Sequence, residues 1–541
     1  MKKLLLLGDE AIAQGAIDAG ISGVYAYPGT PSTEITEYIQ RSEEANKRQI
    51  RSKWSANEKT AMESALGMSY AGKKSLVCMK HVGLNVAADA FINSGITGAN
   101  GGLVVLSADD PSMHSSQNEQ DSRFYGKFTM IPTMEPSNQQ EAYDMTRYAF
   151  DLSEKYETPV LIRVTTRLAH SRAGVQRVAL RNQNKIKLPT DLKQFILLPA
   201  IARKRYDMLL GKQVAFKDDS SESGFNKLYV GEDKSLGIIS CGISYNYLEE
   251  NYKDDKIPYS ILKIGQYPVP RNLLNKLYES VDEILVLEEG YPIIEELLRG
   301  MLNKGKKIKG RMDGTIPMAG ELTPKKVAIA LKLKVEKVHN TPDIVRGRPP
   351  KLCDGCSHTD TFTALNEAMN HFGPGRVFSD IGCYTLSALA PLESINSCVD
   401  MGASITMAIG AADAGLFPSV AAIGDSTFTH SGITGLLDAV NTKSPITVII
   451  NDNSTTGMTG GQDSSAFEKV EDICRGIGVE ENHIRFLKPL RRYNEENIKI
   501  ILEELNYIGV SVIISRRECV QTLGRRMKLK ARQRSETIKT S

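Results

Sequence analysis

Short apolar runs alternate with amphipathic stretches along most of the chain. Runs such as LVVLSA and PVLIRV place several apolar residues in a row, which is typical of strands buried on both faces of a parallel sheet. The stretches between them carry apolar residues at helical spacing. Strands and helices that alternate in this way predict an α/β fold built from three-layer α/β/α domains.

The alternation divides the chain into three predicted domains. We expect α/β domains over residues 1–175, 235–338 and 345–520. Residues 176–234 lose the rhythm and contain basic clusters and the polar run DDSSESG, so they are predicted to be an irregular linker. Residues 521–541 form a basic tail.

Composition and charge exclude several classes of protein. Hydrophobic residues make up 41% and charged residues 24% of 541 residues, as in ordinary globular chains. The 67 basic and 64 acidic residues nearly cancel, so we expect no nucleic-acid partner. No apolar run is long enough for a membrane span, and the first leucines are too few for a signal peptide, which predicts a cytoplasmic protein.

Two polar residues follow predicted strands in the third domain. The apolar run SVAAIG precedes Asp425, and ITVIIND leads to Asn453, 28 positions later. A strand-helix-strand unit with a right-handed crossover places the carboxyl ends of both strands side by side, where open α/β sheets bind ligands. A carboxylate and an amide oxygen suit Mg²⁺, which also binds phosphates. Taken singly, such residues are usually a helix cap and a turn residue.

This pair resembles the diphosphate-anchoring motif of thiamine-diphosphate enzymes, in which an asparagine follows a Gly-Asp pair after nearly thirty residues. Here the motif reads GDSTFTHSG and NDNSTTGMTGGQ. The resemblance implies that Mg²⁺ is held by Asp425, Asn453 and the main-chain carbonyl of Thr455. The residues that it implies near the diphosphate are Gly424, Ser426 and Thr427.

A thiamine cofactor also needs a carboxylic acid for its aminopyrimidine ring. In the stretch WSANEKTAMESALGMSYAG, Glu58 stands nine residues before Gly67 and in front of small residues, which matches the pattern of these enzymes, whereas Glu63 does not. By itself, a glutamate at the start of a helix is most often solvated. The resemblance further implies a homodimer, because the pyrimidine and diphosphate sites of such enzymes usually come from different subunits.

Longer motifs narrow the resemblance to one family. The stretches YPGTPSTEI, MKHVGLNVAADAF, RPPKLCDGCSH and DIGCYTLSALAPL resemble the α subunit of indolepyruvate ferredoxin oxidoreductase, and such matches extend in order from Leu5 to about Cys519. The resemblance implies decarboxylation of a 2-oxo acid, normally an arylpyruvate, with transfer of the acyl group to coenzyme A. It also implies a smaller β subunit and a ferredoxin-like electron acceptor as partners.

Several histidines and cations are candidates for contacts with the substrate. His81 and His358 lie in stretches that match the family and are predicted to be catalytic donors, although a single histidine is more often structural. His114 and His430 are weaker candidates. Further candidates for anchoring a carboxylate, a loop or coenzyme A are Lys80, Asn85, Arg123 and Arg167, and a structural salt bridge is the simpler role for the arginines.

The cysteines raise the question of a metal site. Cys353 and Cys356 form a CxxC pair, followed by Cys383 and Cys398, so zinc or iron has to be considered. The resemblance disfavours this, because comparable cysteines occur in relatives whose clusters lie elsewhere. We therefore expect these residues to line the active site, with Cys383 in contact with the cofactor.

The chain departs from the family pattern near its end. The family usually continues into a ferredoxin module with two CxxCxxCxxxCP runs, whereas only Cys519 follows Cys474 here. We therefore expect no iron-sulfur cluster on this chain and expect electrons to leave through a partner protein. From Arg516 to Ser541 there are nine basic and two acidic residues, which could dock an acidic ferredoxin or simply be solvated.

Two other functions stay open at this point. A thiamine enzyme without clusters could stop after decarboxylation and act as a 2-oxo acid decarboxylase or carboligase. A non-catalytic assembly subunit would instead be expected to have lost part of the cofactor motif, and Glu58, Asp425 and Asn453 are all present.

Overall fold

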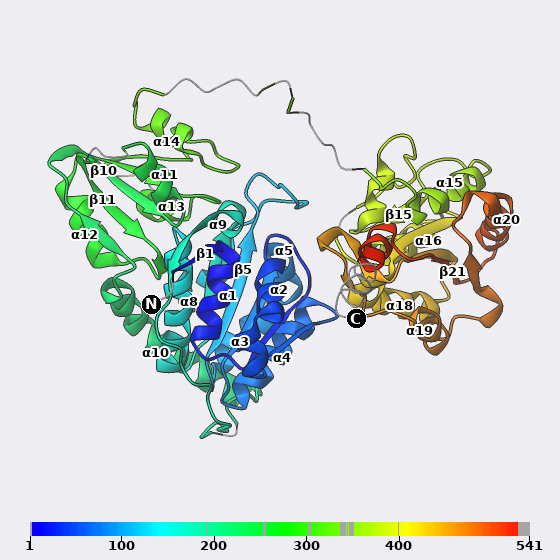
Figure 1. Cartoon of the computed structure of the whole chain (residues 1–541), viewed down its shortest axis with the longest axis horizontal. Helices are drawn as coiled ribbons and strands as arrows, with labels where there is room; N and C mark the ends of the chain where they lie inside the picture. Colours follow the sequence, from blue (N-terminus) through cyan, green and yellow to red (C-terminus); the bar gives the residue numbers. More distant parts are fainter. Residues whose placement is uncertain are drawn as a thin grey trace, which may run out of the picture. The chain divides into compact units, whose positions relative to one another are not determined.

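A computed structural model describes residues 3–528 except 192, 253–255, 301–304, 336–341, 343, 346–350 and 399. The chain forms two compact units, Met1–His339 and Asn340–Ser541 (Figure 1). The first unit contains two large sheets and the second contains one. None of the helices within the described residues has both the length and the apolar composition needed to cross a bilayer.

The first sheet has seven strands in the order β12-β6-β7-β5-β4-β2-β3, all parallel except β12. Its strands are β2 (Gly23–Ala26), β3 (Arg51–Trp54), β4 (Ser75–Lys80), β5 (Leu103–Asp109), β6 (Thr133–Met134), β7 (Val160–Thr165) and β12 (Gln266–Tyr267). Its helices are α1 (Gly8–Asp18), α2 (Thr33–Arg41), α3 (Glu43–Lys47), α4 (Glu58–Tyr70), α5 (His81–Val86), α6 (Ala88–Thr97), α7 (Arg123–Thr129), α8 (Gln139–Tyr156) and α9 (Thr166–His170). A separate antiparallel pair joins β1 (Lys3–Leu7) to β8 (Arg172–Gln176).

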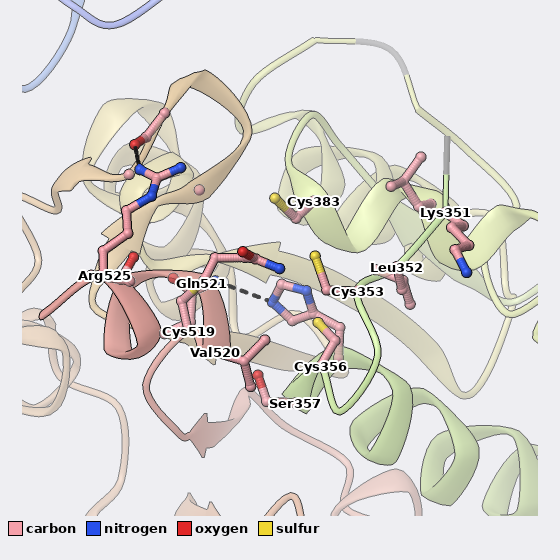
Figure 2. A pocket seen from close by; sticks show the side chains of 17 residues that line it. Lys351, Leu352, Cys353, Cys356, Ser357, Cys383, Cys519, Val520, Gln521 and Arg525 are labelled. Atoms are coloured by element: carbon pink, nitrogen blue, oxygen red, sulfur yellow. Dashed lines mark hydrogen bonds between the residues drawn. The ribbon is translucent and has the colours of Figure 1, made fainter. Parts of the chain in front are cut away.

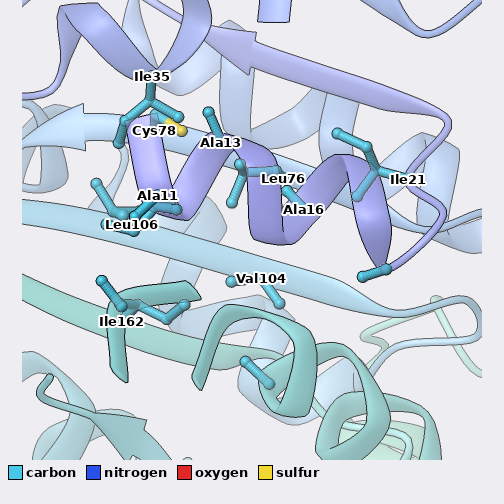
Figure 3. Close-up of a cluster of buried hydrophobic side chains, with 14 of the residues drawn as sticks. Ala11, Ala13, Ala16, Ile21, Ile35, Leu76, Cys78, Val104, Leu106 and Ile162 are labelled. Carbon is cyan, nitrogen blue, oxygen red and sulfur yellow. The ribbon is translucent and has the colours of Figure 1, made fainter. Parts of the chain in front are cut away.

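Strand β4 shows why this sheet is covered on both faces. Successive side chains of a strand point to opposite faces, and all six residues of β4 are buried. Leu76 and Cys78 join the core beneath α1 and α8 (Figure 3), whereas Val77 and Met79 join a second core with α4 and α6. The apolar runs therefore mark strands sandwiched between helices.

The second sheet has five strands in the order β14-β13-β10-β11-β9, parallel except for β9. These are β9 (Lys227–Tyr229), β10 (Asp233–Cys241), β11 (Tyr259–Ile264), β13 (Glu283–Leu287) and β14 (Lys307–Lys309). The helices are α11 (Ser244–Glu250), α12 (Arg271–Ser280), α13 (Ile293–Arg299) and α14 (Pro324–Ala330). The two faces of this sheet again belong to separate hydrophobic cores.

The segment predicted as an irregular linker contains a long helix, which corrects the sequence-based expectation. Helix α10 (Pro199–Glu222) begins with a proline, a residue well suited to the first turn, and buries Leu209 and Phe216. The acidic end that suggested a loop is helical because Asp219 accepts hydrogen bonds from Tyr148 and Lys155 of α8. Tertiary contacts thus override a weak amphipathic pattern.

The sheet of the second unit has five parallel strands in the order β15-β16-β17-β21-β20. These are β15 (Val377–Ser379), β16 (Ser419–Gly424), β17 (Ile446–Asp452), β20 (Ile484–Leu487) and β21 (Ser511–Arg516). The helices are α15 (Ser357–Met369), α16 (Ala403–Asp413), α17 (Asp425–Thr427), α18 (Ile433–Thr442), α19 (Val470–Ile477) and α20 (Asn494–Leu505), and a hairpin joins β18 (Thr455–Thr456) to β19 (Gln462–Asp463).

Separate cores cover the two faces of this sheet, with α16, α18 and α19 on one face and α15 and α20 on the other. All three sheets are therefore parts of three-layer α/β/α arrangements. Residues 520–528 are helical, so the predicted basic tail begins as a helix. The rest of the tail, residues 529–541, lies outside the described residues.

Candidate functional site

The carboxyl ends of β16 and β17 bring the predicted metal ligands together. In the parallel register, Gly424 at the end of β16 pairs with Asn451 of β17. Asp425 begins the short helix directly after β16, and Asn453 comes two residues after Asn451. Both side chains are buried, with exposed fractions of 2% for Asp425 and 8% for Asn453.

The Asp425 carboxylate has an unused oxygen. Its Oδ1 accepts a hydrogen bond from the Ser426 amide at 2.8 Å, whereas Oδ2 is buried and has no hydrogen-bond partner among the described residues. Burial, together with the nearby Asp452 carboxylate, raises the pKa of Asp425 to about 7. A buried carboxylate with a spare oxygen fits a hard cation, because the cation would both ligate the oxygen and compensate the charge.

Asn453 connects the metal candidate to His358. Its Oδ1 accepts a hydrogen bond from the Thr455 amide at 3.1 Å, and its Nδ2 lies 3.4 Å from Nε2 of His358. An amide nitrogen can only donate a hydrogen bond, so Nε2 of His358 is the acceptor. The proton of the neutral ring is therefore on Nδ1. Burial lowers the pKa of His358 to about 4, and Nδ1 has no partner in the described part of the chain. The neutral ring therefore offers an unused N–H.

The other predicted phosphate contacts surround the same turn. The hydroxyl groups of Ser426 and Thr456 lie 2.8 Å apart, and the Thr427 hydroxyl donates to the Ile381 carbonyl at 3.0 Å. These bonds connect α17 with β18 and with the segment after β15. The turn that follows β16 is thus fixed on two sides.

Sequence reasoning missed Tyr384, which shapes this turn. Its ring lies so close to Gly424 that a Cβ atom there would come within 2.6 Å of Cε1, and it leaves even less room at Gly382. Its hydroxyl donates to Asp380, whose pKa burial raises to about 7. The adjacent glycines of GDST and DIGC were the available signal, since a glycine often marks a close approach.

Cysteines that are far apart in the sequence line one cavity of about 90 Å³ in the second unit (Figure 2). Cys353 and Cys356 belong to the turn before α15, Cys383 follows β15, and Cys519 follows β21. Burial, and then the neighbouring thiols, raise the pKa of Cys383 to about 12. His358 and Asn453 line the same cavity.

The helix over residues 520–528 lies along the same cavity. Gln521 and Arg525 contribute to its lining, and Arg525 donates a hydrogen bond to the Gly460 carbonyl in the turn between β18 and β19. Cys398, the fourth cysteine named from the sequence, is exposed and is not among the lining residues. Cys519 lines the cavity instead.

Glu58 lies in the first unit as the first residue of α4. It is 5% exposed, and Asn57 caps the helix by accepting from the Thr60 amide. Gly83 on α5 makes room for it, because a Cβ atom at that position would lie 2.5 Å from Oε1 of Glu58. The carboxyl group is therefore held inside the unit, in contrast to the solvated glutamate that a helix start usually carries.

His81 and Lys80 are occupied by a neighbouring loop. The His81 nitrogens lie 3.4 Å from the Ala108 carbonyl oxygen and 3.2 Å from the Asn118 carbonyl oxygen. Lys80 donates to the Ser115 carbonyl at 2.6 Å, and burial lowers its pKa to about 8. Both side chains thus hold the loop between β5 and α7.

The two candidate arginines are salt-bridged. Arg123 is fully buried and binds Asp121 at 2.6 Å and Glu288 at 3.0 Å. Arg167 forms a two-pronged pair with Glu321 at 2.5 and 2.6 Å on a more exposed surface. Both guanidinium groups are therefore paired with carboxylates and are not available to bind a ligand in this arrangement.

Two family models of thiamine-dependent enzymes match this chain. A family model described as pyruvate flavodoxin/ferredoxin oxidoreductase, thiamine diP-bdg matches residues 14–208, and one described as thiamine pyrophosphate enzyme, C-terminal TPP binding domain matches residues 380–497. A solved 2-oxoglutarate:ferredoxin oxidoreductase from Magnetococcus marinus has a similar fold, with a TM-score of 0.51 at 16% identity over 61% of this chain and 65% of that chain.

Curated relatives cover almost the whole chain. Indolepyruvate oxidoreductase subunit IorA from Archaeoglobus fulgidus is 38% identical over 96% of this chain and 86% of the relative. The subunit of the same name from Thermococcus kodakarensis is 37% identical over the same shares. The family resemblance inferred from the sequence is confirmed. The chain therefore belongs to the indolepyruvate oxidoreductase subunit IorA family, a family of thiamine-dependent 2-oxoacid oxidoreductases.

Proposed function

We propose that this chain binds thiamine diphosphate through Mg²⁺ at the carboxyl ends of β16 and β17 and uses it to oxidise an aryl 2-oxo acid such as indolepyruvate. The acyl group would pass to coenzyme A, and the electrons to a partner protein. The observation that carries the proposal is the buried Asp425 carboxylate, whose Oδ2 has no partner among the described residues and lies at the strand ends with Asn453. Family membership favours the oxidative reaction over simple decarboxylation, carboligation or a non-catalytic role.

The proposed ligands follow from the chemistry of the residues present. Asp425, Asn453 and the Thr455 carbonyl would supply oxygen atoms to Mg²⁺, which shares its coordination with phosphates. The small side chain of Gly424 would allow a phosphate to approach the backbone. Near the diphosphate, the hydroxyl groups of Ser426 and Thr427 would complete the site.

We propose Glu58 as the acid for the aminopyrimidine. When bound, thiamine diphosphate would supply a carbon acid whose deprotonated form is a nucleophile for the 2-oxo group, and a ring that can take up the electrons left by decarboxylation. Glu58 would hold a proton at the ring nitrogen, and the N–H of His358 would stabilise negative charge on the substrate oxygen. His81, with both nitrogens facing protein oxygens, would act by positioning the loop between β5 and α7.

A variant of Glu58 tests its role in proton transfer separately from cofactor binding. Glu58→Gln should abolish exchange of the cofactor's C2 proton, followed by NMR, and leave diphosphate affinity within about threefold. Glu63, which lies on α4 and pairs with Lys59 at the surface, provides the matched control Glu63→Gln. Unchanged exchange in Glu58→Gln would refute the assignment.

We propose a homodimer of this chain as the catalytic core, joined by a smaller β subunit and a ferredoxin-like acceptor. Anaerobic incubation with arylpyruvates, coenzyme A, thiamine diphosphate and Mg²⁺ tests the reaction. We expect two electrons to appear in reduced dye for each acyl-CoA formed. Aldehyde or a ligation product without dye reduction would contradict the oxidative reaction, and bound cofactor without any turnover would support an assembly role.

The cysteine-lined cavity supports a second element of the proposal, namely how electrons leave. Four cysteines line this one small cavity, namely Cys353, Cys356, Cys383 and Cys519. Pockets for organic cofactors usually have roughly 300–1,000 Å³, so a cavity of about 90 Å³ fits an inorganic group better. Four thiolates are the usual ligands of an iron-sulfur cluster.

We therefore propose a 4Fe-4S cluster at these cysteines, in place of the earlier expectation that this chain carries none. Chain purified without oxygen should contain about four iron atoms and four sulfide ions, and Cys519→Ser should lose most of both. Cys398→Ser, at an exposed cysteine outside the cavity, is the control. Equal iron in the Cys519→Ser and unaltered chains would contradict the proposal.

A further inference from the structure

Three side chains of the first unit come together in an arrangement that the proposed reaction does not use. Asp9 lies in the first turn of α1, Glu34 in the first turn of α2, and His170 at the end of α9. Two carboxylate oxygens and an imidazole nitrogen from these residues all lie within 4.8 Å of one another. Three helices that are distant in sequence thus place three potential ligand atoms around one point.

Asp9 is a buried carboxylate with an unusual environment. It is completely buried, and neither of its carboxylate oxygens has a hydrogen-bond partner among the described residues. Burial raises its pKa well above the usual value, and Glu34 and Glu10 raise it further. Arg172 pairs with Glu10, the residue after Asp9, at 3.4 Å. A buried carboxylate without a partner is costly, and a bound cation would remove that cost.

The other two ligands connect Asp9 to solvent. Nε2 of His170 lies 3.6 Å from Oε1 of Glu34, and their side chains are 35% and 34% exposed. The second oxygen of Glu34, Oε2, is buried and has no hydrogen-bond partner among the described residues. An ion could therefore enter between Glu34 and His170 and reach Asp9 beneath them, keeping water on its outer side.

We propose that Asp9, Glu34 and His170 bind a divalent transition-metal ion such as Mn²⁺ or Zn²⁺. Two carboxylates and one imidazole match the ligand preferences of these ions, whereas Mg²⁺ and Ca²⁺ prefer oxygen ligands alone. Ligand atoms at about 2.1 Å from one ion lie at most about 4.2 Å apart, so the observed spacing needs only a small contraction. The ion would fasten the first turns of α1 and α2 to α9.

Counting bound Mn²⁺ in the full chain tests this site. Mn²⁺ is chosen because thiolates bind it weakly, which keeps the cysteine-lined cavity of the second unit out of the measurement. After chelation, the chain is titrated with Mn²⁺ in the presence of thiamine diphosphate, and bound ion is measured by electron paramagnetic resonance. We expect two ions per chain, one at Asp425 and one at Asp9.

Variants assign the two ions separately. His170→Gln and Asp9→Asn should each lose one ion, with affinity at that site weakened at least about tenfold, while Asp425→Ala should lose the other. The inference would be overturned if His170→Gln and Asp9→Asn bound as much Mn²⁺ as the unaltered chain. Loss in Asp425→Ala is judged independently, so failure of the thiamine site and failure of this site are distinguishable.

Thermal melting provides a second measurement, because Asp9→Asn keeps the side-chain volume and removes the buried charge. Without metal, this variant should melt at a higher temperature than the unaltered chain. Mn²⁺ should then raise the melting temperature of the unaltered chain only. An equal rise in the variant would contradict the site.

Discussion

Two regions of the molecule contain buried charged side chains, and they differ in whether those charges have partners. In the first unit, Arg123 and Arg163 are surrounded by carboxylates where the first two sheets meet. In the second unit, the carboxylate of Asp425 lies at the strand ends, and its Oδ2 has no hydrogen-bond partner among the described residues. Paired charge is the mark of a structural network, whereas unpaired buried charge indicates a place for a ligand.

The paired region joins the two sheets of the first unit. Arg163 of β7 binds Asp109 at 2.7 Å and also pairs with Glu135 at 2.5 Å. Its Nη2 donates to the Glu289 carbonyl at the end of β13, at 2.9 Å. Although burial raises the pKa of Asp121, the guanidinium groups of Arg123 and Arg163 outweigh it and lower the value to about 2. Each of the two buried guanidinium groups therefore has carboxylate partners.

The strand-end region around Asp425 differs from this network, because several of its buried polar atoms have no partner among the described residues. Atoms without partners among the described residues include Oδ2 of Asp425, Oδ1 of Asp452 and Nδ1 of His358. They lie on α15, α17 and β17, around the carboxyl ends of one sheet, where α/β folds bind ligands. Folding alone leaves these groups unsatisfied, so this strand-end region should gain stability when a ligand binds, whereas the paired network around Arg123 and Arg163 should not.

Breaking the paired network should have the largest effect. Arg163→Met leaves Asp109 and Glu135 buried without their cation, so we expect a loss of about 3–5 kcal/mol in the free energy of unfolding. Urea denaturation followed by circular dichroism measures it. Arg475→Met is the control, since that arginine also has carboxylate partners but is exposed. Similar losses of unfolding free energy in the two variants would contradict a larger contribution from the buried network.

Asp380 should make the stability of the second unit depend on pH. Burial raises its pKa to about 7, and its partners are the hydroxyl groups of Ser404 and Tyr384. Between about pH 4 and 7 the folded chain keeps a proton that the unfolded chain has lost, so stability should fall as pH rises. Asp380→Asn should reduce that slope by about 1.4 kcal/mol per pH unit at mid-window.

The same denaturation curves, recorded from pH 4 to 8 without cofactor, check this expectation. A slope that is unaffected by Asp380→Asn would mean that Asp380 titrates normally. Asp472→Asn, at an exposed residue of α19, should leave the slope unchanged.

Removing the unpaired charge should have a smaller effect of the opposite sign. Without Mg²⁺ or cofactor at pH 8, Asp425→Asn should raise the free energy of unfolding by about 1–2 kcal/mol, because the buried oxygen no longer carries charge. Thermal or urea denaturation measures the change. A destabilised variant would indicate that Asp425 already has a structural partner.

The sequence predicted the fold well where patterns were strong. Uninterrupted apolar runs identified strands such as β5 and β17, because a strand covered on both faces needs apolar residues throughout. It failed at α10, whose amphipathic pattern is weak and whose polar end is held by tertiary hydrogen bonds from Tyr148 and Lys155. Local composition cannot reveal such contacts.

The candidate site was predictable only in part. The proximity of Asp425 and Asn453 was predictable because the strand ends of a parallel sheet meet. Tyr384 was missed because nothing in an isolated tyrosine indicates that its ring will pack on Gly424. Cys519 was set apart from Cys353 because only the fold brings residues at both ends of this unit to one cavity.

Calorimetric titration of thiamine diphosphate, with and without Mg²⁺, tests the central claim most directly. If the unpaired Asp425 oxygen is the metal ligand, the unaltered chain should bind the cofactor only with Mg²⁺, and Asp425→Asn should weaken that binding at least about 100-fold. Asp472→Asn should bind normally. Equal Mg²⁺-dependent affinity in Asp425→Asn and the unaltered chain would contradict the account.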